Sequence, residues 1–399
     1  MGEWKEFEVS ALCRSGLLVI GDGYRAKNSE LSATGFPFAR AGNIDRGFNF
    51  TDADCFPIEN LERVGEKTSR PGDTVFTSKG TVGRFAFVRS STPQFVYSPQ
   101  LCYWRSLNSD EIDPRFLFYW MQSREFFAQV EAVKGQTDMA DYVSLSDQRQ
   151  MIITLPEGPE QKEIASILSS FDDKIDLLYR QNKTLEALAE TLFRQWFVEE
   201  AEDGWEEITL STIADHMKSS INPAKNPHTT FYHYSLPAFD EGQEPKKELG
   251  SEILSNKYLV LPKSVLMSKL NPRIPRIWRI DNELVSEFSV ASTEFQVVKP
   301  KDESWYGVIY CFLKSSKVSQ ELSNSAGGTS GSHQRVSPDD IFSLTLLRPP
   351  DDKVNGFNFA TDDFWKKITR NKTEIRTLTR LRDTILSKLM SGEVRLNTV

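Results

Sequence analysis

The sequence predicts an α+β protein with two mixed α/β domains, each followed by a long coiled-coil helix. Short motifs recur in the same order at an offset of roughly 190–200 residues, which indicates an internal duplication. Two segments keep a heptad spacing of apolar residues, the period of a coiled coil. The stretches before them alternate short β-type runs with turn residues. The 399 residues are enough for two or three domains.

Each half of the chain contains the same three motifs in the same order, one near its start and two further along. Because matched copies occur in one chain, we expect a protein that reads two similar objects. The matched segments are Trp4–Ser10 with Trp205–Ser211, Pro71–Lys79 with Pro262–Lys269, and Gly135–Thr137 with Gly328–Thr329.

The first domain is expected over residues 1–157. Residues 73–78 and 83–89 predict two strands around a turn at Lys79 and Gly80. A helix is predicted from Pro114, with Asp113 as its N-cap, because proline suits the first helical position and aspartate caps the free N–H groups.

The first long helix is expected over residues 158–203. Its apolar seam has alternating spacings of four and three over five heptads. About 40 residues at ~1.5 Å each make a rod of ~60 Å. The seam residues are Ile164, Leu168, Phe171, Ile175, Leu178, Asn182, Leu185, Ala189, Leu192 and Trp196.

The second domain is expected over residues 204–350, with strands joined by loops rich in Pro, Asn and Ser. The second long helix is expected over 361–392, with Thr361 as its cap and Gly392 as its end. Its seam residues are Phe364, Ile368, Asn371, Ile375, Leu378, Leu381 or Arg382, Ile385 and Leu389.

The two helices are expected to pair with each other, antiparallel, with the domains related by a pseudo-two-fold axis. Residues 156–204 hold five basic against twelve acidic side chains, whereas residues 349–399 hold ten against seven. Asn182 and Asn371 each begin an Asn-Lys-Thr, and a polar seam residue specifies register and partner. The alternatives are packing of each helix on its own domain, or pairing with another protein. The expected helix-pair or partner interface comprises Phe171, Ile175, Leu178, Asn182, Leu185, Ile368, Asn371, Ile375 and Leu378.

Composition narrows the classes of protein. The four cysteines form no CxxC pair, which argues against a zinc site and a secreted disulfide framework. The sequence has no apolar run of membrane-spanning length and no apolar signal core near Met1, so we expect a cytoplasmic protein.

The sequence contains little that predicts catalysis. It has no phosphate-binding loop, dinucleotide fingerprint, methyltransferase signature, GxSxG or HExxH. His228 and His233 lack companion ligands, so a metal site there is not expected. We therefore expect a non-catalytic chain without metal or cofactor.

Two stretches are candidates for nucleic-acid contact. The net charge of −8 does not favour nucleic acid, but the globular stretches are nearly balanced and could each carry a basic face. In one, Lys79, Arg84 and Arg89 lie on the expected hairpin. In the other, residues 269–279, cations alternate with prolines that forbid a regular helix. The alternative is outward charges on amphipathic strands. The candidate DNA-binding residues are Lys79, Arg84, Gln136, Thr137, Lys269, Arg273, Arg276, Ser332, His333, Gln334 and Arg335.

These residues resemble the specificity (S) subunit of type I restriction-modification systems. Residues 155–197 resemble the central conserved region of that family, and residues 371–394 its distal conserved region. Residues 71–75, 80–83 and 135–137 resemble the scaffold of a target-recognition domain. The resemblance covers nearly the whole chain.

The resemblance implies two target-recognition domains separated by an antiparallel pair of conserved helices. Each domain would read one half of a split DNA site. The helices would set the gap and dock two methyltransferase (M) subunits, while restriction (R) subunits would supply nuclease and translocase. In the second domain residues 268–273 replace the turn Gly80–Gly83, so we expect an asymmetric site. The base contacts of the family vary with the target and cannot be transferred.

The main alternative is a structural adaptor whose helices assemble partners and whose domains bind protein without DNA specificity. A gel shift with a random pool of duplexes separates the two readings. A self-sufficient nuclease or methyltransferase has no supporting motif.

Overall fold

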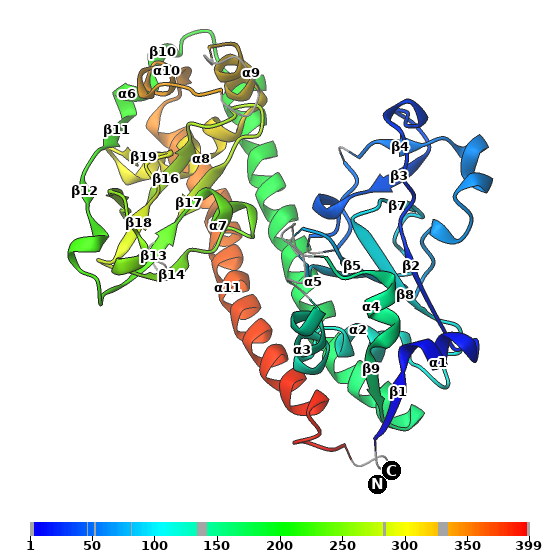
Figure 1. Cartoon of the computed structure of the whole chain (residues 1–399). Coiled ribbons are helices and arrows are strands. Elements are labelled where there is room, and N and C mark those ends of the chain that lie inside the picture. The colour runs from blue at the N-terminus through cyan, green and yellow to red at the C-terminus, as the bar shows by residue number, and fades with distance from the viewer. Residues whose placement is uncertain are drawn as a thin grey trace. The chain divides into compact units, whose positions relative to one another are not determined.

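The computed structural model describes residues 4–45, 47–51, 53–80, 82–133, 142–281, 285–325 and 334–396. The chain forms two compact units (Figure 1). Unit 1 comprises Met1–Leu177 and Ile375–Val399, and unit 2 comprises Leu178–Glu374. The expected boundaries at 157/158 and 203/204 therefore differ from the observed division, because each unit includes a part of both long helices.

Unit 1 is built around a four-stranded sheet of order β2-β8-β5-β6, with all neighbours antiparallel. A smaller sheet has the order β4-β3-β7, in which β3 and β7 are parallel, and β1 pairs with β9. The strands are β1 (Lys5–Glu8), β2 (Leu18–Asp22), β3 (Phe36–Ala39), β4 (Cys55–Phe56), β5 (Thr74–Thr77), β6 (Phe85–Phe87), β7 (Val96–Tyr97), β8 (Leu101–Ser106) and β9 (Ile152–Leu155). The shorter helices are α1 (Val9–Arg14), α2 (Pro114–Trp120), α3 (Arg124–Val133) and α4 (Leu145–Gln150).

Unit 2 repeats this plan with a four-stranded antiparallel sheet of order β11-β19-β16-β17, a pair β10-β20, and a sheet of order β12-β15-β18-β13-β14. The strands are β10 (Glu206–Thr209), β11 (Ala214–Met217), β12 (Ser220–Ile221), β13 (Thr230–Tyr234), β14 (Lys246–Leu249), β15 (Lys257–Leu259), β16 (Ser264–Ser268), β17 (Ile277–Ile280), β18 (Ser289–Ala291), β19 (Phe295–Pro300) and β20 (Thr345–Arg348). The shorter helices are α6 (Leu210–Ile213), α7 (Leu236–Asp240), α8 (Tyr306–Lys314), α9 (Ser316–Ser325) and α10 (Pro338–Phe342).

The two main sheets have the same strand order, and the parallel pair β3-β7 has its counterpart in β13-β18. This shared topology confirms the duplication that the sequence motifs predict. The expected hairpin is present as β5 and β6. The Asp113 side chain accepts hydrogen bonds from the backbone N–H groups of Arg115 and Phe116 at the start of α2, as expected of an N-cap.

The long helices are α5 (Gly158–Arg194), which continues as a π-helical turn over Gln195–Glu199, and α11 (Asp351–Met390). The expected start at Thr361 is wrong. Thr361 is fully buried inside α11, and its hydroxyl donates to the Phe357 carbonyl at 2.9 Å. A threonine can bond backbone in this way within a helix, so its preference for caps does not identify a terminus. Among the described residues, no helix is long and apolar enough to cross a membrane.

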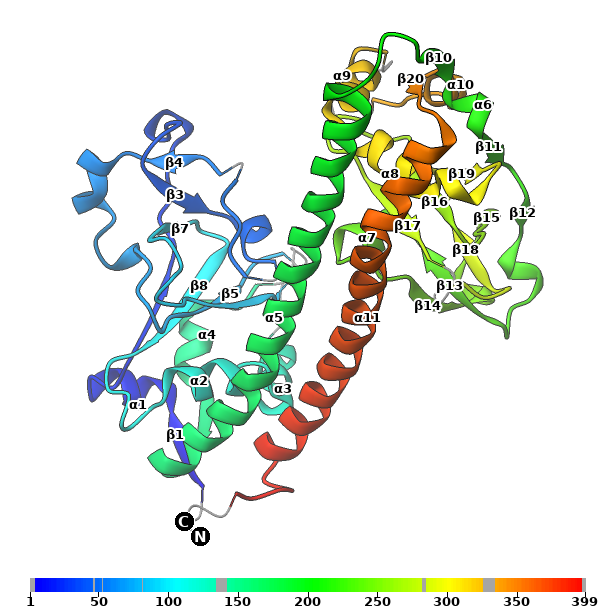
Figure 2. The same cartoon turned by 180° about the vertical axis from the view of Figure 1, so that it is seen from behind.

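The two helices run antiparallel within each unit (Figure 2). In unit 2 Asn371 Nδ2 donates to Asn182 Oδ1 at 2.8 Å. Phe193 of α5 and Phe197 of the π-helical turn that follows it contact Phe357 of α11. The two seam asparagines therefore pair with each other. In unit 1 the Arg382 guanidinium donates to Asp172 at 2.7 Å. The ambiguous seam position is thus filled by Arg382, and Leu381 is exposed.

Each main core includes both long helices. The unit 1 core contains Ile164 and Leu168 from α5 and Leu389 from α11. The unit 2 core contains Phe193 and Phe357, and Leu185 packs against its edge. Of the expected helix-pair residues, Ile175, Leu178, Ile368, Asn371 and Ile375 are buried, whereas Phe171, Asn182, Leu185 and Leu378 are half-buried.

In each unit, a tyrosine on a helix that follows the last strand of the main sheet in the sequence donates its hydroxyl to a carboxylate of α5. In unit 1 the Tyr119 hydroxyl of α2 donates to Asp172 at 2.6 Å. In unit 2 the Tyr310 hydroxyl of α8 donates to Glu186, which also pairs with Lys314 at 3.2 Å. Burial, followed by the nearby carboxylate, raises the pKa of each tyrosine, so both remain hydroxyl donors.

A buried ion pair joins two strands of the unit 1 sheet. Asp73, before β5, is fully buried and accepts from Arg105 of β8 at 2.6 and 2.8 Å. Its carboxylate also accepts from the Tyr97 hydroxyl at 2.6 Å and from the Arg70 backbone at 2.8 Å. The aspartate of the Pro71-Gly-Asp73 motif therefore has a structural role in unit 1, and the matching segment of the second copy contains no aspartate.

The substitution Asp73→Ala should lower the free energy of unfolding of unit 1 by about 3–5 kcal/mol, because it leaves the Arg105 guanidinium buried without its main partner. Urea titration followed by tryptophan fluorescence measures the change. Glu66→Ala is the control: Glu66 also pairs with Arg105 but its side chain is 66% exposed, so we expect a loss below about 1 kcal/mol. Equal losses for the two variants would contradict the structural role of Asp73.

Candidate nucleic-acid interface

The two hairpins of the main sheets carry equivalent loops. Loop 1 is residues 78–84 between β5 and β6, and loop 2 is residues 269–276 between β16 and β17. Each forms an isolated β-bridge with a residue late in its own unit, Lys79 with Tyr142 and Leu270 with Arg335. The structure therefore places the two predicted basic stretches at the same point of the duplicated fold.

Loop 1 is a tight turn with positive φ at Gly80 and Gly83. Lys79 is exposed, and its ammonium lies 5.9 Å from the centre of the Tyr142 ring. Arg84 is exposed and pairs with Asp45 at 2.9 Å. Both retain access to solvent, so both can approach a phosphate or a base edge.

Arg89 does not share this face. Its guanidinium pairs with Asp173 of α5 at 2.7 Å within unit 1. This cation of the predicted hairpin therefore attaches the sheet to the helix.

Loop 2 contains a hydrogen-bonded turn over Asn271–Ile274 with positive φ at Asn271, so it is not the extended loop that its prolines predict. It is braced from several sides. The Asn271 backbone N–H donates to the Gln334 carbonyl at 2.9 Å, and the Ile274 N–H donates to the Asn271 carbonyl at 2.9 Å. The Arg276 guanidinium binds Asp240 through two hydrogen bonds of 2.7 and 2.9 Å. Arg273 is exposed and has no ion-pair partner among the residues that the structure describes.

Two arginines of the second stretch therefore have structural partners. Arg276 holds loop 2 against α7 through Asp240. Arg279 pairs with Asp281, and its guanidinium lies 4.5 and 4.4 Å from the ring centres of Tyr306 and Trp365. The three arginines of this stretch thus comprise one solvent-facing group, Arg273, and two bracing groups, Arg276 and Arg279.

The structure describes some of the remaining candidate DNA-binding residues and not others. Arg335 is exposed and pairs with Glu294 at 3.0 Å, and Gln334 is half-buried beside loop 2. Lys269 is half-buried, and burial together with the charges of Lys218 and Lys269 lowers the pKa of His216. Gln136, Thr137, Ser332 and His333 lie outside the described residues.

Sequence reasoning missed three residues at this candidate interface. Tyr142 lies against Lys79, Asp240 fixes Arg276, and Ile274 is exposed at the tip of loop 2. Only Ile274 had a local signal, its position between two prolines. The other two depend on contacts between distant segments.

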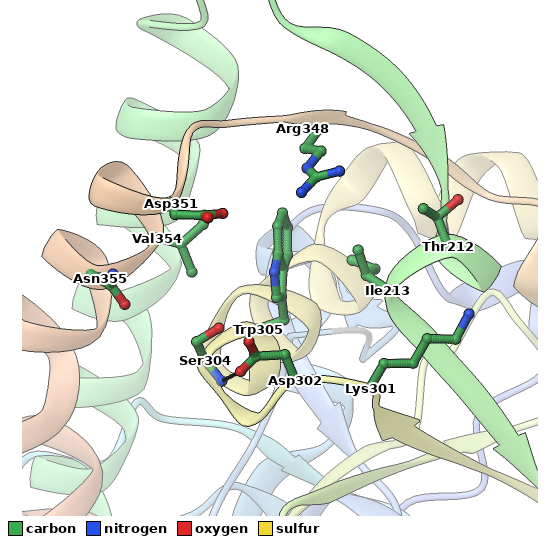
Figure 3. A pocket seen from close by; sticks show the side chains of 10 residues that line it. All are labelled: Thr212, Ile213, Lys301, Asp302, Ser304, Trp305, Arg348, Asp351, Val354 and Asn355. Atoms are coloured by element: carbon green, nitrogen blue, oxygen red, sulfur yellow. Dashed lines mark hydrogen bonds between the residues drawn. The ribbon is translucent and has the colours of Figure 1, made fainter.

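Unit 2 also contains a cavity of about 360 Å³ between α6 and the start of α11. Figure 3 shows Arg348 next to the indole of Trp305, with Lys301 farther from it, below Thr212. Asp302 and Asp351 also line this cavity, so its two cations face two carboxylates. Such a balanced lining attracts neither phosphate nor a cation by net charge, and loops 1 and 2 remain the better candidates. No cluster of metal-ligating side chains occurs in the described part of the chain.

Comparisons with a family model and with known proteins give matches to specificity subunits of type I restriction enzymes. Residues 1–187 match the family model described as the type I restriction modification DNA specificity domain. The type I restriction enzyme MjaIX specificity subunit of Methanocaldococcus jannaschii is 23% identical over 351 residues, which cover 81% of this chain and 78% of that protein. The HindI specificity subunit of Haemophilus influenzae is 25% identical over 207 residues, which cover 50% of this chain and 42% of that protein.

Among solved structures, the type I restriction-modification S subunit from M. genitalium is similar with a TM-score of 0.52 and 15% identity. The match covers 99% of this chain and 97% of that one, and it supports the fold. Residues 1–187 therefore belong to the type I restriction modification DNA specificity domain family, and most of the chain is similar to a type I restriction-modification specificity subunit.

Proposed function

We propose that the chain is the DNA-recognition subunit of a type I restriction-modification complex and that it reads a bipartite, asymmetric site. The observation that carries the proposal is the pair of loops at equivalent points of a duplicated fold, with different exposed groups. Loop 1 presents Lys79 and Arg84, and loop 2 presents Arg273. Exposed cations on rigid loops suit phosphates and guanine edges.

The rest of the complex supplies the chemistry in this proposal. Methyltransferase subunits, two of them, dock on the helices, and restriction subunits add cleavage and translocation. The chain itself contributes no catalytic group and holds no cofactor. What supports this is the similarity of the chain to type I restriction enzyme specificity subunits.

Mapping of methylated sites tests the proposal directly. Cells that carry this chain with its methyltransferase subunits should show one bipartite target of two half-sites. Replacing residues 204–350 by the matching residues of a relative should change one half-site and leave the other intact. A change in both half-sites, or methylation without a bipartite pattern, would exclude one domain per half-site.

Arg273→Ala should weaken binding of a duplex that carries the target by about 10-fold or more, because a good contact by an arginine is worth about 1–3 kcal/mol. If Arg273 contacts a phosphate, the slope of log Kd against log salt should also fall by about one. Fluorescence anisotropy over a range of salt measures both quantities. Lys225→Ala is the control, because Lys225 is also exposed in unit 2 but lies outside loop 2.

Arg276→Ala and Asp240→Ala should weaken DNA binding to a similar extent, because either change releases loop 2. A direct DNA contact by Arg276 would instead make Arg276→Ala the more harmful change, since Asp240→Ala keeps the cation. Neutral results for Arg273 and Arg276 together would remove loop 2 from the interface.

We further propose that the paired helices set the gap between the half-sites. Deleting Lys174–Arg180 and Thr373–Thr379 removes one heptad from each helix and keeps the contacts Asp172–Arg382 and Asn182–Asn371. Each helix loses ~10 Å, which equals about 3 base pairs at ~3.4 Å each. Methylation mapping should show the same half-sites with a gap shorter by about three pairs. Duplicating the same heptads should lengthen it, and an unchanged gap in both variants would refute this role.

A further inference from the structure

Loop 2 exposes an apolar side chain at its tip that the proposed function does not yet use. Ile274 is 56% exposed and follows the exposed Arg273. At the corresponding turn of loop 1, Val82 packs instead against the core of unit 1. An exposed apolar tip is therefore a feature of unit 2 among the described residues of the two loops.

The tip is held in place before any ligand binds. Pro272 and Pro275 flank Arg273 and Ile274 and fix their own φ angles. The Ser319 hydroxyl lies 3.4 Å from the Pro272 carbonyl as a donor, and the hydrogen bond from Ile274 N–H to Asn271 O closes the turn. As a β-branched side chain, Ile274 also has few rotamers to lose. Burying this side chain against a ligand therefore costs little conformational entropy.

The chemistry of the tip limits what it can recognise. Isoleucine cannot form a hydrogen bond, and the apolar group on the base edges of the major groove is the thymine methyl. The neighbouring cation Arg273 favours a polyanion over an apolar protein surface. A single isoleucine between a cation and a proline is also a smaller apolar surface than protein interfaces use.

We propose that Ile274 reads a thymine of the half-site bound by unit 2, through contact with its 5-methyl group. This inference rests on the proposed function and adds a specificity-determining residue to it. Thymine and uracil form the same base pair but differ by this methyl group, so replacing thymine by uracil isolates the contact.

The test uses the full-length chain and duplexes with the mapped target. Each thymine of the half-site assigned to unit 2 is replaced in turn by uracil, and Kd is measured for the wild type and Ile274→Ala at one salt concentration. One replacement should weaken wild-type binding about fourfold, the value for one buried methyl group. The same replacement should leave the Kd of Ile274→Ala unchanged. Leu254→Ala, at another exposed apolar position in unit 2, should respond to uracil as the wild type does.

Several outcomes would overturn the proposal while leaving DNA recognition intact. They are a unit 2 half-site without thymine, uracil substitutions that do not change wild-type binding, and an equal loss in wild type and Ile274→Ala. A variant that alters DNA bending without any uracil effect would indicate a wedge between bases and would also refute the methyl contact. Absence of sequence-specific binding by the wild-type chain would instead refute the proposed function itself.

Discussion

Neither unit can complete its core without both long helices. Unit 1 takes Ile164 and Leu168 from α5 and Leu389 from α11, and unit 2 takes Phe193 and Phe357 from the same two helices. Burial of these side chains is the main force that attaches each sheet to the helices. The hydrogen bonds of Tyr119 to Asp172 and of Tyr310 to Glu186 depend on orientation, so they also constrain how each domain packs against α5. Both domains therefore need the antiparallel pair of helices to complete their cores.

On this common framework, the two units differ where they face a ligand. The strand order of the main sheets is the same, but loop 1 turns on two glycines whereas loop 2 is stiffened by two prolines. Such sequence differences in the loop of a hairpin are tolerated because the loop contributes little to the core. Recognition can therefore change in one unit while the helices and the other unit stay as they are.

The sequence predicts the elements that depend on local or periodic signals. The heptads identify α5 and most of α11, Asp113 and Pro114 identify the start of α2, and the duplicated motifs identify the repeated topology. The start of α11 was missed because Thr361 has the residue type of a cap, although its hydroxyl bonds to its own helix. Val354 and Phe357 continue the spacing of three and four residues before Thr361 and are buried, so the seam itself extends to the true start of the helix.

The sequence does not predict which cations form ion pairs within the protein and which face solvent. Arg273, Arg276 and Arg279 look alike in the sequence, yet Asp240, Asp281 and the rings of Tyr306 and Trp365 decide which of them face solvent. Asp240 lies 36 residues from Arg276. No periodic pattern encodes such a contact, because it depends on how the strands are arranged.

The division of the chain also affects the order in which it can fold during synthesis. Unit 2 is one continuous segment, whereas unit 1 joins the first 177 residues to the last 25. The ribosome adds about 5–20 residues per second, so the sheet of unit 1 waits on the order of 10–40 s for the C-terminal turns of α11. Until then Ile164 and Leu168 lack their partners Leu389 and Met390. The nascent N-terminal domain therefore presents an open apolar seam, which chaperones can cover and which a second nascent chain can occupy.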